Sequence, residues 1–173
     1  MAKYEGQVRP AAASESERIL KNAQAAQKKL IRAGSEQQIS GYSERNVYAR
    51  IKRSELWALE VSGVVIGSAF VEPATPKRFP QISSWNAVPD DYSGWFLYGL
   101  VIHPERQGQG WGRALLDGIC QKLELTAPSM LLDCWAGNTK LRCFYIDAGF
   151  DLHGIFPEAG YEIAVFKRNF PGC

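Results

Sequence analysis

The sequence predicts an α/β fold in which a mixed central sheet of about seven strands is flanked by about four helices. Three observations support this prediction. The 173 residues are typical of one domain with a sizeable core, so residues 1–173 are assigned to a single domain. The content of 46% hydrophobic and 22% charged residues is that of a folded globular protein. Short apolar runs alternate with segments whose apolar residues recur at helical spacing.

The first elements are a short strand and a helix. A strand is expected over Tyr4–Val8, ended by Arg9 and Pro10. Ser14 and Glu17 have the spacing of a capping box, which predicts a helix start. Apolar residues then recur at helical spacing up to Gly34, which can close the helix: Ile19, Ala23, Ala26 and Leu30.

A second helix and a hairpin follow. The helix is expected over Glu44–Arg53, and its basic residues indicate either a solvated face or a contact with an anionic partner. Leu56–Val61 and Val64–Val71 are apolar runs around a two-residue turn, which predicts a β-hairpin. Residues 73–94 break this pattern with four prolines among aromatic residues. The aromatic residues of this loop either line a substrate groove or hold the loop down.

The second half of the chain alternates strands and helices. Trp95–Ile102 is almost wholly apolar, which predicts a central strand. The helix expected after it implies a crossover, so the strands at 95–102 and 130–134 should be parallel. The remaining expected elements are helix Gly110–Leu125, strand Met130–Cys134, helix Thr139–Ala148, and strands Asp151–Phe156 and Tyr161–Arg168.

Composition argues against several classes of partner. A net charge of +2 and a pI near 8.3 are too mild to indicate nucleic-acid binding. No apolar run has the length of a membrane span or a signal peptide, so we expect a cytoplasmic protein without a membrane partner. The four cysteines form no CxxC pair, and they are interpreted as idle or buried thiols, with a thiol role for Cys134 or Cys143 as the alternative. The oligomeric state is open, and a homodimer fits the sequence.

The segment that follows the central strand predicts a phosphate site. His103-Pro104 ends the strand, and Gly108, Gly110 and Gly112 precede a helix. Glycines at such a junction let backbone N–H groups approach an anion at the positive end of the helix. No Gly-Lys-Ser/Thr follows, so this is not a Walker A loop, and the order of a dinucleotide-binding loop is also missing.

A second segment, Leu131–Phe150, repeats the order strand, loop and helix. Parallel strands followed by helices form a cleft at their carboxyl ends, where an elongated ligand fits. Asn138 begins the second helix, and Tyr145 follows seven residues later on the same helix face. Taken singly, Asn138 is typical of a helix cap and Tyr145 of a core residue. Together they indicate an amide and a phenol that serve one ligand.

These two segments, HPERQGQGWGRALL and NTKLRCFYIDAGF, resemble the GCN5-related N-acetyltransferase (GNAT) superfamily. The first is similar to its acyl-CoA pyrophosphate loop, and the second to its downstream motif of Asn, Tyr seven residues on, and Gly-Phe. The resemblance covers roughly Trp95–Phe150, and the expected order of elements elsewhere agrees with that fold. It implies an enzyme that transfers an acetyl group from acetyl-CoA directly to an amine, without a metal.

The resemblance also implies roles for individual residues. The phenol of Tyr145 would protonate the CoA thiolate, Asn138 would contact the pantetheine arm, and Asp133 is the best candidate for the general base. Rivals for the base are Glu72 and a water relayed through Tyr98 or His103. The implied CoA-binding residues are Leu100, Val101, Ile102, Gln107, Gly108, Gln109, Gly110, Trp111, Gly112, Arg113, Asn138 and Tyr145.

The acceptor is the least defined partner. The expected acceptor is a small-molecule amine or an amino acid, and the alternatives are a protein or aminoacyl-tRNA amine, or a module that senses CoA without turnover. Asp90 and Asp91 either attract a cationic amine or are surface charges, and Lys140 and Arg142 either approach the CoA phosphates or coat a helix. No role is assigned to His153.

Overall fold

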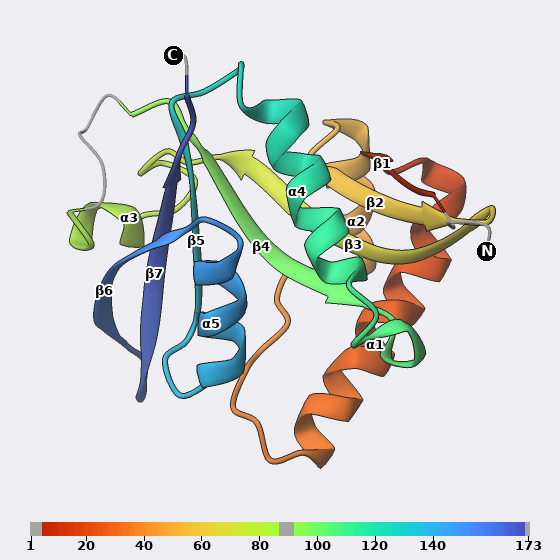
Figure 1. Cartoon of the computed structure of the whole chain (residues 1–173), viewed down its shortest axis with the longest axis horizontal. Coiled ribbons are helices and arrows are strands. Elements are labelled where there is room, and N and C mark those ends of the chain that lie inside the picture. The colour runs from red at the N-terminus through yellow and green to blue at the C-terminus, as the bar shows by residue number, and fades with distance from the viewer. Residues whose placement is uncertain (1–4, 87–91, 172–173) are drawn as a thin grey trace. The chain divides into compact units, whose positions relative to one another are not determined.

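The computed structural model of the chain describes residues 5–86 and 92–171. Its strands form one mixed sheet of seven, in the order β1-β2-β3-β4-β5-β7-β6 (Figure 1). This confirms the predicted fold class. Five α-helices and two 3₁₀ turns occur in the described part. The elements are β1 (Gly6–Pro10), η1 (Ala13–Glu15), α1 (Ser16–Arg32), α2 (Glu44–Lys52), β2 (Leu56–Val61), β3 (Val64–Pro73), α3 (Gln81–Ser84), β4 (Trp95–Ile102), η2 (Pro104–Arg106), α4 (Trp111–Leu123), β5 (Ser129–Trp135), α5 (Thr139–Asp147), β6 (Asp151–Glu158) and β7 (Tyr161–Asn169).

The central strands follow the predicted order. β4 has the bounds expected from its apolar run, and β4 and β5 are parallel, with Trp95, Phe96 and Leu97 opposite Met130, Leu131 and Leu132. β5 pairs antiparallel with β7, and β7 with β6. The helix count exceeds the expected four because the short α3 interrupts the segment that was predicted to be all loop.

Two predictions at the N-terminal end are wrong. Arg9 and Pro10 do not end the first strand, because both pair with β2 in an antiparallel ladder. β1 is the edge of the sheet, where a strand tolerates a proline. The expected capping box is also absent: the carboxylate of Glu15 accepts the N–H of Ala12 at 2.7 Å, and Glu17 forms an ion pair with Lys21.

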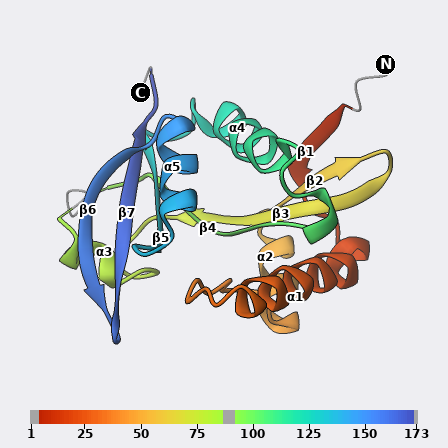
Figure 2. The same cartoon turned by 60° about the horizontal axis from the view of Figure 1, so that its bottom comes forward.

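The chain divides into two compact units, and the first comprises residues 5–71 and 98–119 of the described chain. Its α1 and α2 cover one face of β2 and β3, and α4 lies on the other face (Figure 2). The first face carries a core cluster of this unit, which consists of Ala11, Ile19, Val47, Leu56, Ala58, Val65 and Phe70. On the other face α4 lies close to β1, since a Cβ on Gly118 would come within 2.6 Å of Val8 Cγ2.

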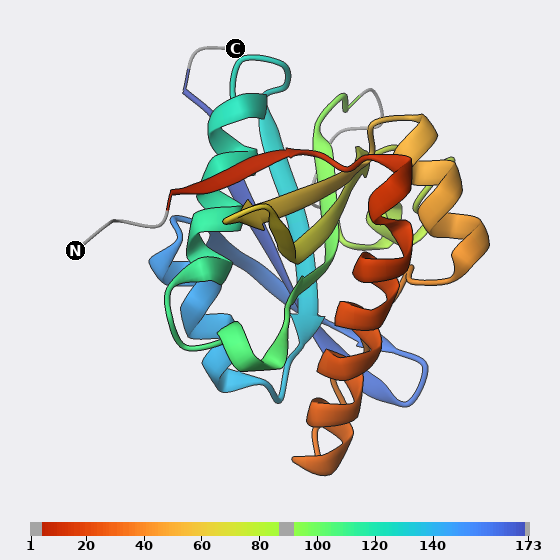
Figure 3. The same ribbon diagram turned by 90° about the vertical axis from the view of Figure 1, so that its right-hand side faces the viewer.

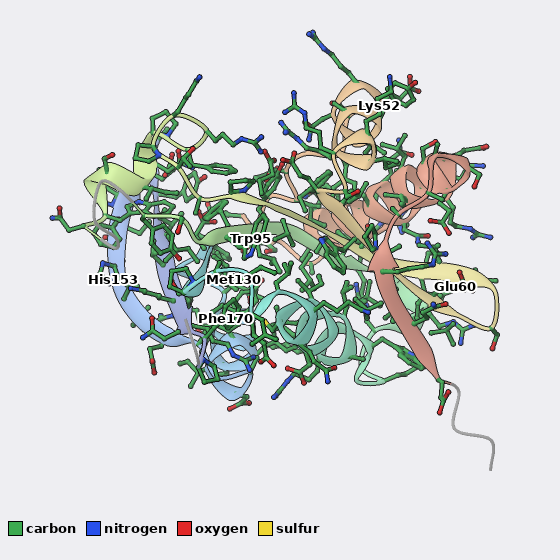
Figure 4. All side chains as sticks on the ribbon, turned by 90° about the horizontal axis from the view of Figure 1, so that it is seen from above. Lys52, Glu60, Trp95, Met130, His153 and Phe170 are labelled. Carbon is green, nitrogen blue, oxygen red and sulfur yellow. The ribbon has the colours of Figure 1, made fainter. Side chains whose placement is uncertain are left out.

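The second unit comprises residues 72–97 and 120–171, without the undescribed residues 87–91. One face of its strands packs on α5, where the ring of Tyr145 lies 5.7 Å from that of Phe166. The opposite face packs on α3, where Trp85 contacts Phe156 and its carbonyl bonds to Nε2 of His153 at 2.8 Å. Figure 4 shows His153 on β6, beside α3. The ring of His153 also stacks on Phe156 of the same strand, so this side chain packs between β6 and the end of α3.

Candidate active site

The loop between β4 and α4 is shaped by glycines in the left-handed region. Gly108 has φ +76° and Gly110 has φ +85°, a conformation that residues with a Cβ rarely adopt. A Cβ at either position would meet no atom within 4 Å, so packing does not explain these glycines. The backbone conformation and the open space beside it explain them instead. Figure 3 shows this loop running from η2 to the start of α4.

The loop leaves a run of backbone donors without acceptors. Among the described residues, no acceptor is found for the N–H groups of Gly108, Gln109, Gly110, Trp111 and Gly112. Three of these groups belong to the loop and two to the first turn of α4, where the helix itself supplies no acceptor. The helix dipole adds positive potential at the same point. The predicted anion site therefore has the donors that a phosphate requires.

Side chains fix the ends of this loop. Gln107 donates Nε2–H to the carbonyl of Ile102 at 3.0 Å, and its Oε1 accepts from Nζ of Lys29 at 2.8 Å. Nε of Arg113 bonds to Oδ2 of Asp117 at 2.7 Å. Lys29 comes from α1, 78 residues before Gln107, and nothing in the sequence pattern predicted this contact.

In the second unit, Tyr145 is buried to 5% exposure among aromatic rings. Its ring contacts those of Phe144, Phe150 and Phe166. No hydrogen bond to its hydroxyl is found among the described residues. Burial, with a smaller effect from Cys134, raises the pKa of Tyr145, so the phenol stays protonated at neutral pH. The residue is thus both a core residue and a proton donor without a partner.

Asn138 and Arg142 shape the start of α5. The side chain of Asn138 is the N-cap, with Oδ1 accepting the N–H of Leu141 at 3.0 Å. Arg142 donates from Nη1 to the carbonyl of Ala136 at 3.3 Å, while its Nε is buried without an acceptor in the described chain. The cap leaves the Nδ2 donors of Asn138 available, so structural and ligand-binding roles are compatible.

Asp133 is a partly buried carboxylate on β5. Burial, with a smaller effect from the negative charge of Glu158, raises its pKa to about 6. Strand alternation places its side chain on the face of β5 opposite to that of its neighbour Leu132. Leu132 pairs with Phe166, which contacts Tyr145. Asp133 and Tyr145 therefore belong to opposite faces of the sheet in this unit.

The residues named as rivals to Asp133 each have contacts within the protein. Glu72 is buried and forms an ion pair with Arg78 at 3.1 Å. Nδ1 of His103 accepts the N–H of Glu105 at 3.3 Å as the cap of η2. The ring of Tyr98 stacks on Phe70. The assignment of the base to Asp133 stays a prediction from the sequence.

The described cysteines are free thiols and form no disulfide. Cys120 and Cys134 are buried and Cys143 is exposed, and all three are free thiols. Burial raises the pKa of Cys134 to about 12, which keeps it protonated and unreactive. Cys173, Asp90 and Asp91 lie outside the described residues.

Within the described ranges, no group of three or more His, Cys, Asp or Glu could hold a metal ion. No described helix combines the length and apolar character needed to cross a membrane.

Comparison with known proteins decides the family. A model described as "Acetyltransferase (GNAT) family" matches residues 23–150, most of the chain. The chain belongs to the GNAT acetyltransferase family. The match includes both the glycine loop and the segment from Asp133 to Tyr145, so the resemblance seen in the sequence is confirmed. No curated protein matches the sequence significantly.

Solved GNAT structures share the fold at low sequence identity. A GNAT acetyltransferase from Streptococcus agalactiae is 16% identical, with a TM-score of 0.79 and 95% of each chain covered. One from Listeria monocytogenes is 19% identical, with a TM-score of 0.76, covering 97% of this chain and 96% of that one. The PaiA N-acetyltransferase of Thermoplasma acidophilum, in complex with coenzyme A, is 15% identical, with a TM-score of 0.65 and coverages of 96% and 99%.

The raised pKa of Asp133 gives a test of its surroundings. Because the folded-state pKa of about 6 lies above the ordinary 3.8, the folded state loses stability relative to the unfolded state as the pH rises through this interval. Asp133→Asn removes that cost. We expect the variant to be about 1–3 kcal/mol more stable than wild type at pH 8 and equally stable near pH 3 to 4, as measured by urea unfolding.

Asp151→Asn is the matched control, because it removes an exposed carboxylate from the same unit. Its stability is measured over the same pH range and compared with that of Asp133→Asn. An Asp133→Asn variant that is no more stable than wild type at pH 8 would contradict the raised pKa.

Proposed function

We propose that residues 1–173 act as one N-acyltransferase domain that moves an acetyl group from acetyl-CoA directly to an amine, either a small molecule or an amino acid. The observation that carries the proposal is the run of N–H groups without acceptors from Gly108 to Gly112, in a chain of the GNAT family. A cytoplasmic location stays a prediction from the sequence.

The donor supplies an activated thioester and a diphosphate, and the chain's groups fit both. The glycine loop offers N–H donors and open space to the diphosphate. The backbone of Leu100, Val101 and Ile102 would bind the pantetheine arm as a strand binds its neighbour. The full set assigned to the donor is Leu100, Val101, Ile102, Gln107, Gly108, Gln109, Gly110, Trp111, Gly112, Arg113, Asn138 and Tyr145.

Three proton transfers accompany acetyl transfer from the thioester to an ammonium group. Asp133 accepts the first proton from the ammonium, whose nitrogen then has the lone pair that attacks the thioester carbon. As the new C–N bond forms and the C–S bond breaks, Tyr145 donates its phenolic proton to the sulfur. The second proton of the attacking nitrogen leaves as the amide forms and restores the phenol of Tyr145 through solvent, and Asp133 releases its proton to solvent. No metal is assigned to any of these transfers. A carboxyl whose pKa lies near 6 and a phenol held neutral suit these two opposite tasks.

The two groups come from different elements around β5. The side chain of Asp133 points to the face of β5 opposite to the one on which Tyr145 packs, as the pairing of Leu132 with Phe166 indicates. The charge of Asp133 is nevertheless among the smaller effects that raise the pKa of Tyr145, so the two groups lie near enough to interact. This proximity supports the assignment of both groups to one thioester.

The loop's role is tested by Gly110→Ala. A Cβ at φ +85° strains the loop or turns its N–H groups away from the ligand. We expect the Kd for CoA to rise about tenfold, and the Kd for its 3′-phospho-ADP moiety to rise equally, while pantetheine binding is unchanged. Isothermal titration calorimetry gives all three values.

Gly160→Ala is the matched control, because Gly160 has φ +89° and equally open surroundings in the β6–β7 turn. It carries the same backbone strain but should leave CoA binding intact. Equal CoA affinity in wild type and Gly110→Ala would exclude the loop from donor binding.

The acid role is tested by Tyr145→Phe. Release of the CoA thiol is first measured with wild type over a panel of small amines and amino acids, with a peptide N-terminus and a lysine peptide included. With any acceptor found, the variant's kcat should fall about 10- to 1000-fold with little change in CoA affinity. Its stability should not fall, because the hydroxyl has no partner among the described residues.

Unchanged kcat in Tyr145→Phe would exclude the acid role. Tight acetyl-CoA binding without turnover on any amine would instead favour a CoA sensor. No CoA binding at all would overturn the proposed function.

A further inference from the structure

β4 departs from regular strand geometry at Gly99, one residue before the backbone assigned to the pantetheine arm. Gly99 has φ +62°, which is foreign to an extended strand. A Cβ there would lie 2.8 Å from the carbonyl oxygen of Ser40 and 3.1 Å from Tyr42 Cε2. The loop between α1 and α2 therefore packs directly against this irregular peptide. A glycine inside a strand often marks such a distortion.

A buried hydroxyl group holds the Gly99 peptide in place. Tyr42, from the α1–α2 loop, donates its O–H to the carbonyl of Gly99 at 2.6 Å. The same oxygen lies 2.8 Å from Oγ of Ser68 on β3, a side chain with no exposure. Since the single proton of Tyr42 goes to Gly99, the hydroxyl of Ser68 must donate to Tyr42. Each of these three groups therefore has a hydrogen-bond partner.

The surroundings of Tyr42 keep this donor neutral and fixed. Its ring packs against Phe70 with 4.7 Å between centroids, and Phe70 stacks on Tyr98. The preceding carbonyl, of Gly41, accepts Nδ2–H of Asn46 at 2.8 Å. Burial raises the pKa of Tyr42, so the phenol does not lose its proton at physiological pH.

The bond from Tyr42 also fixes the neighbouring amide. The C=O of Gly99 and the N–H of Leu100 belong to one planar trans peptide and point in opposite directions. Holding the carbonyl toward Tyr42 therefore directs the N–H of Leu100 away from it. Leu100 is the first residue of the segment assigned to pantetheine.

We propose that Tyr42, supported by Ser68, is a positioning residue that sets the direction of the Gly99–Leu100 peptide and thereby prepares this backbone for the pantetheine arm of the donor. This inference rests on the proposed function. It adds a residue that no sequence motif indicated.

Tyr42→Phe tests the inference, because it removes the hydroxyl and keeps the ring. Without the bond, the Gly99 peptide can rotate toward an extended conformation. We expect the Kd for CoA to rise about tenfold, with no change in the Kd for 3′-phospho-ADP, which lacks the pantetheine arm. This pattern differs from that of Gly110→Ala, which weakens both.

Tyr92→Phe is the matched control. The hydroxyl of Tyr92 is also buried and bonds to a serine, Ser129, in the other unit. Both variants should lose stability in urea, but only Tyr42→Phe should lose CoA affinity. A loss of CoA affinity in Tyr92→Phe equal to that in Tyr42→Phe would show a general effect of destabilisation and overturn the inference.

Ser68→Ala is the second variant, for the case that Tyr42→Phe does not fold. It weakens the network but keeps the bond from Tyr42 to Gly99, so we expect a smaller loss of CoA affinity and again unchanged 3′-phospho-ADP binding. Unchanged CoA affinity in whichever of the two variants folds would overturn the inference. The proposed function would still be supported if the wild-type protein binds CoA and the Gly110→Ala variant binds it more weakly. Failure of this inference and failure of the proposed function are therefore distinguishable.

Discussion

A folded chain must give nearly every buried polar group a partner, and the structure depends on this constraint throughout. The network of Tyr42, Ser68 and Gly99 satisfies three such groups where a central strand departs from regular geometry. Among the described residues, Nε of Arg142 is the buried side-chain nitrogen or oxygen atom that lacks a partner, and it lies in the segment that the second family motif covers. The N–H groups of Gly108–Gly112 also find no acceptor in the described chain, but these residues are exposed or half-buried and can be reached by a ligand.

In the proposed mechanism each unit supplies one kind of chemistry. In the first unit, the end of β4, the loop and the start of α4 present fixed backbone dipoles, which need no titratable group to bind an anion. In the second unit, burial raises the pKa of Asp133 to about 6 and also raises the pKa of Tyr145. The proposal thus assigns binding to backbone geometry and proton transfer to buried side chains.

The sequence predicted the fold well because the spacing of apolar residues and the positions of turn residues are local signals. The bounds of β4, the hairpin of β2 and β3, and the parallel pairing of β4 with β5 all follow from apolar runs and turns. Local signals failed at Pro10, where the edge position decided whether the strand continued, and at Ser14, where Glu15 formed the bond instead. A four-residue helix, α3, is too short to show a period.

The motifs pointed to the candidate residues, but they did not predict the contacts that position these residues or the burial that shifts a pKa. Tyr42 and Lys29 contact the end of β4 and the glycine loop from distant parts of the chain, and a single sequence carries no signal of such contacts. The pKa of Asp133 likewise depends on burial and on Glu158, which only the fold brings near. Gly99, a glycine inside an apolar strand, was a hint in the sequence of the irregular backbone found there.

The central claim is that the unpaired N–H groups of the glycine loop bind the diphosphate of CoA. Two-dimensional ¹H–¹⁵N NMR spectra of the wild-type protein during titration with CoA test it most directly. If these groups bind the diphosphate, the amide protons of Gly108, Gly110 and Gly112 will show large, saturable downfield shifts. The same shifts are expected with 3′-phospho-ADP and not with pantetheine. Saturable CoA binding that leaves these three amide signals unmoved would contradict it.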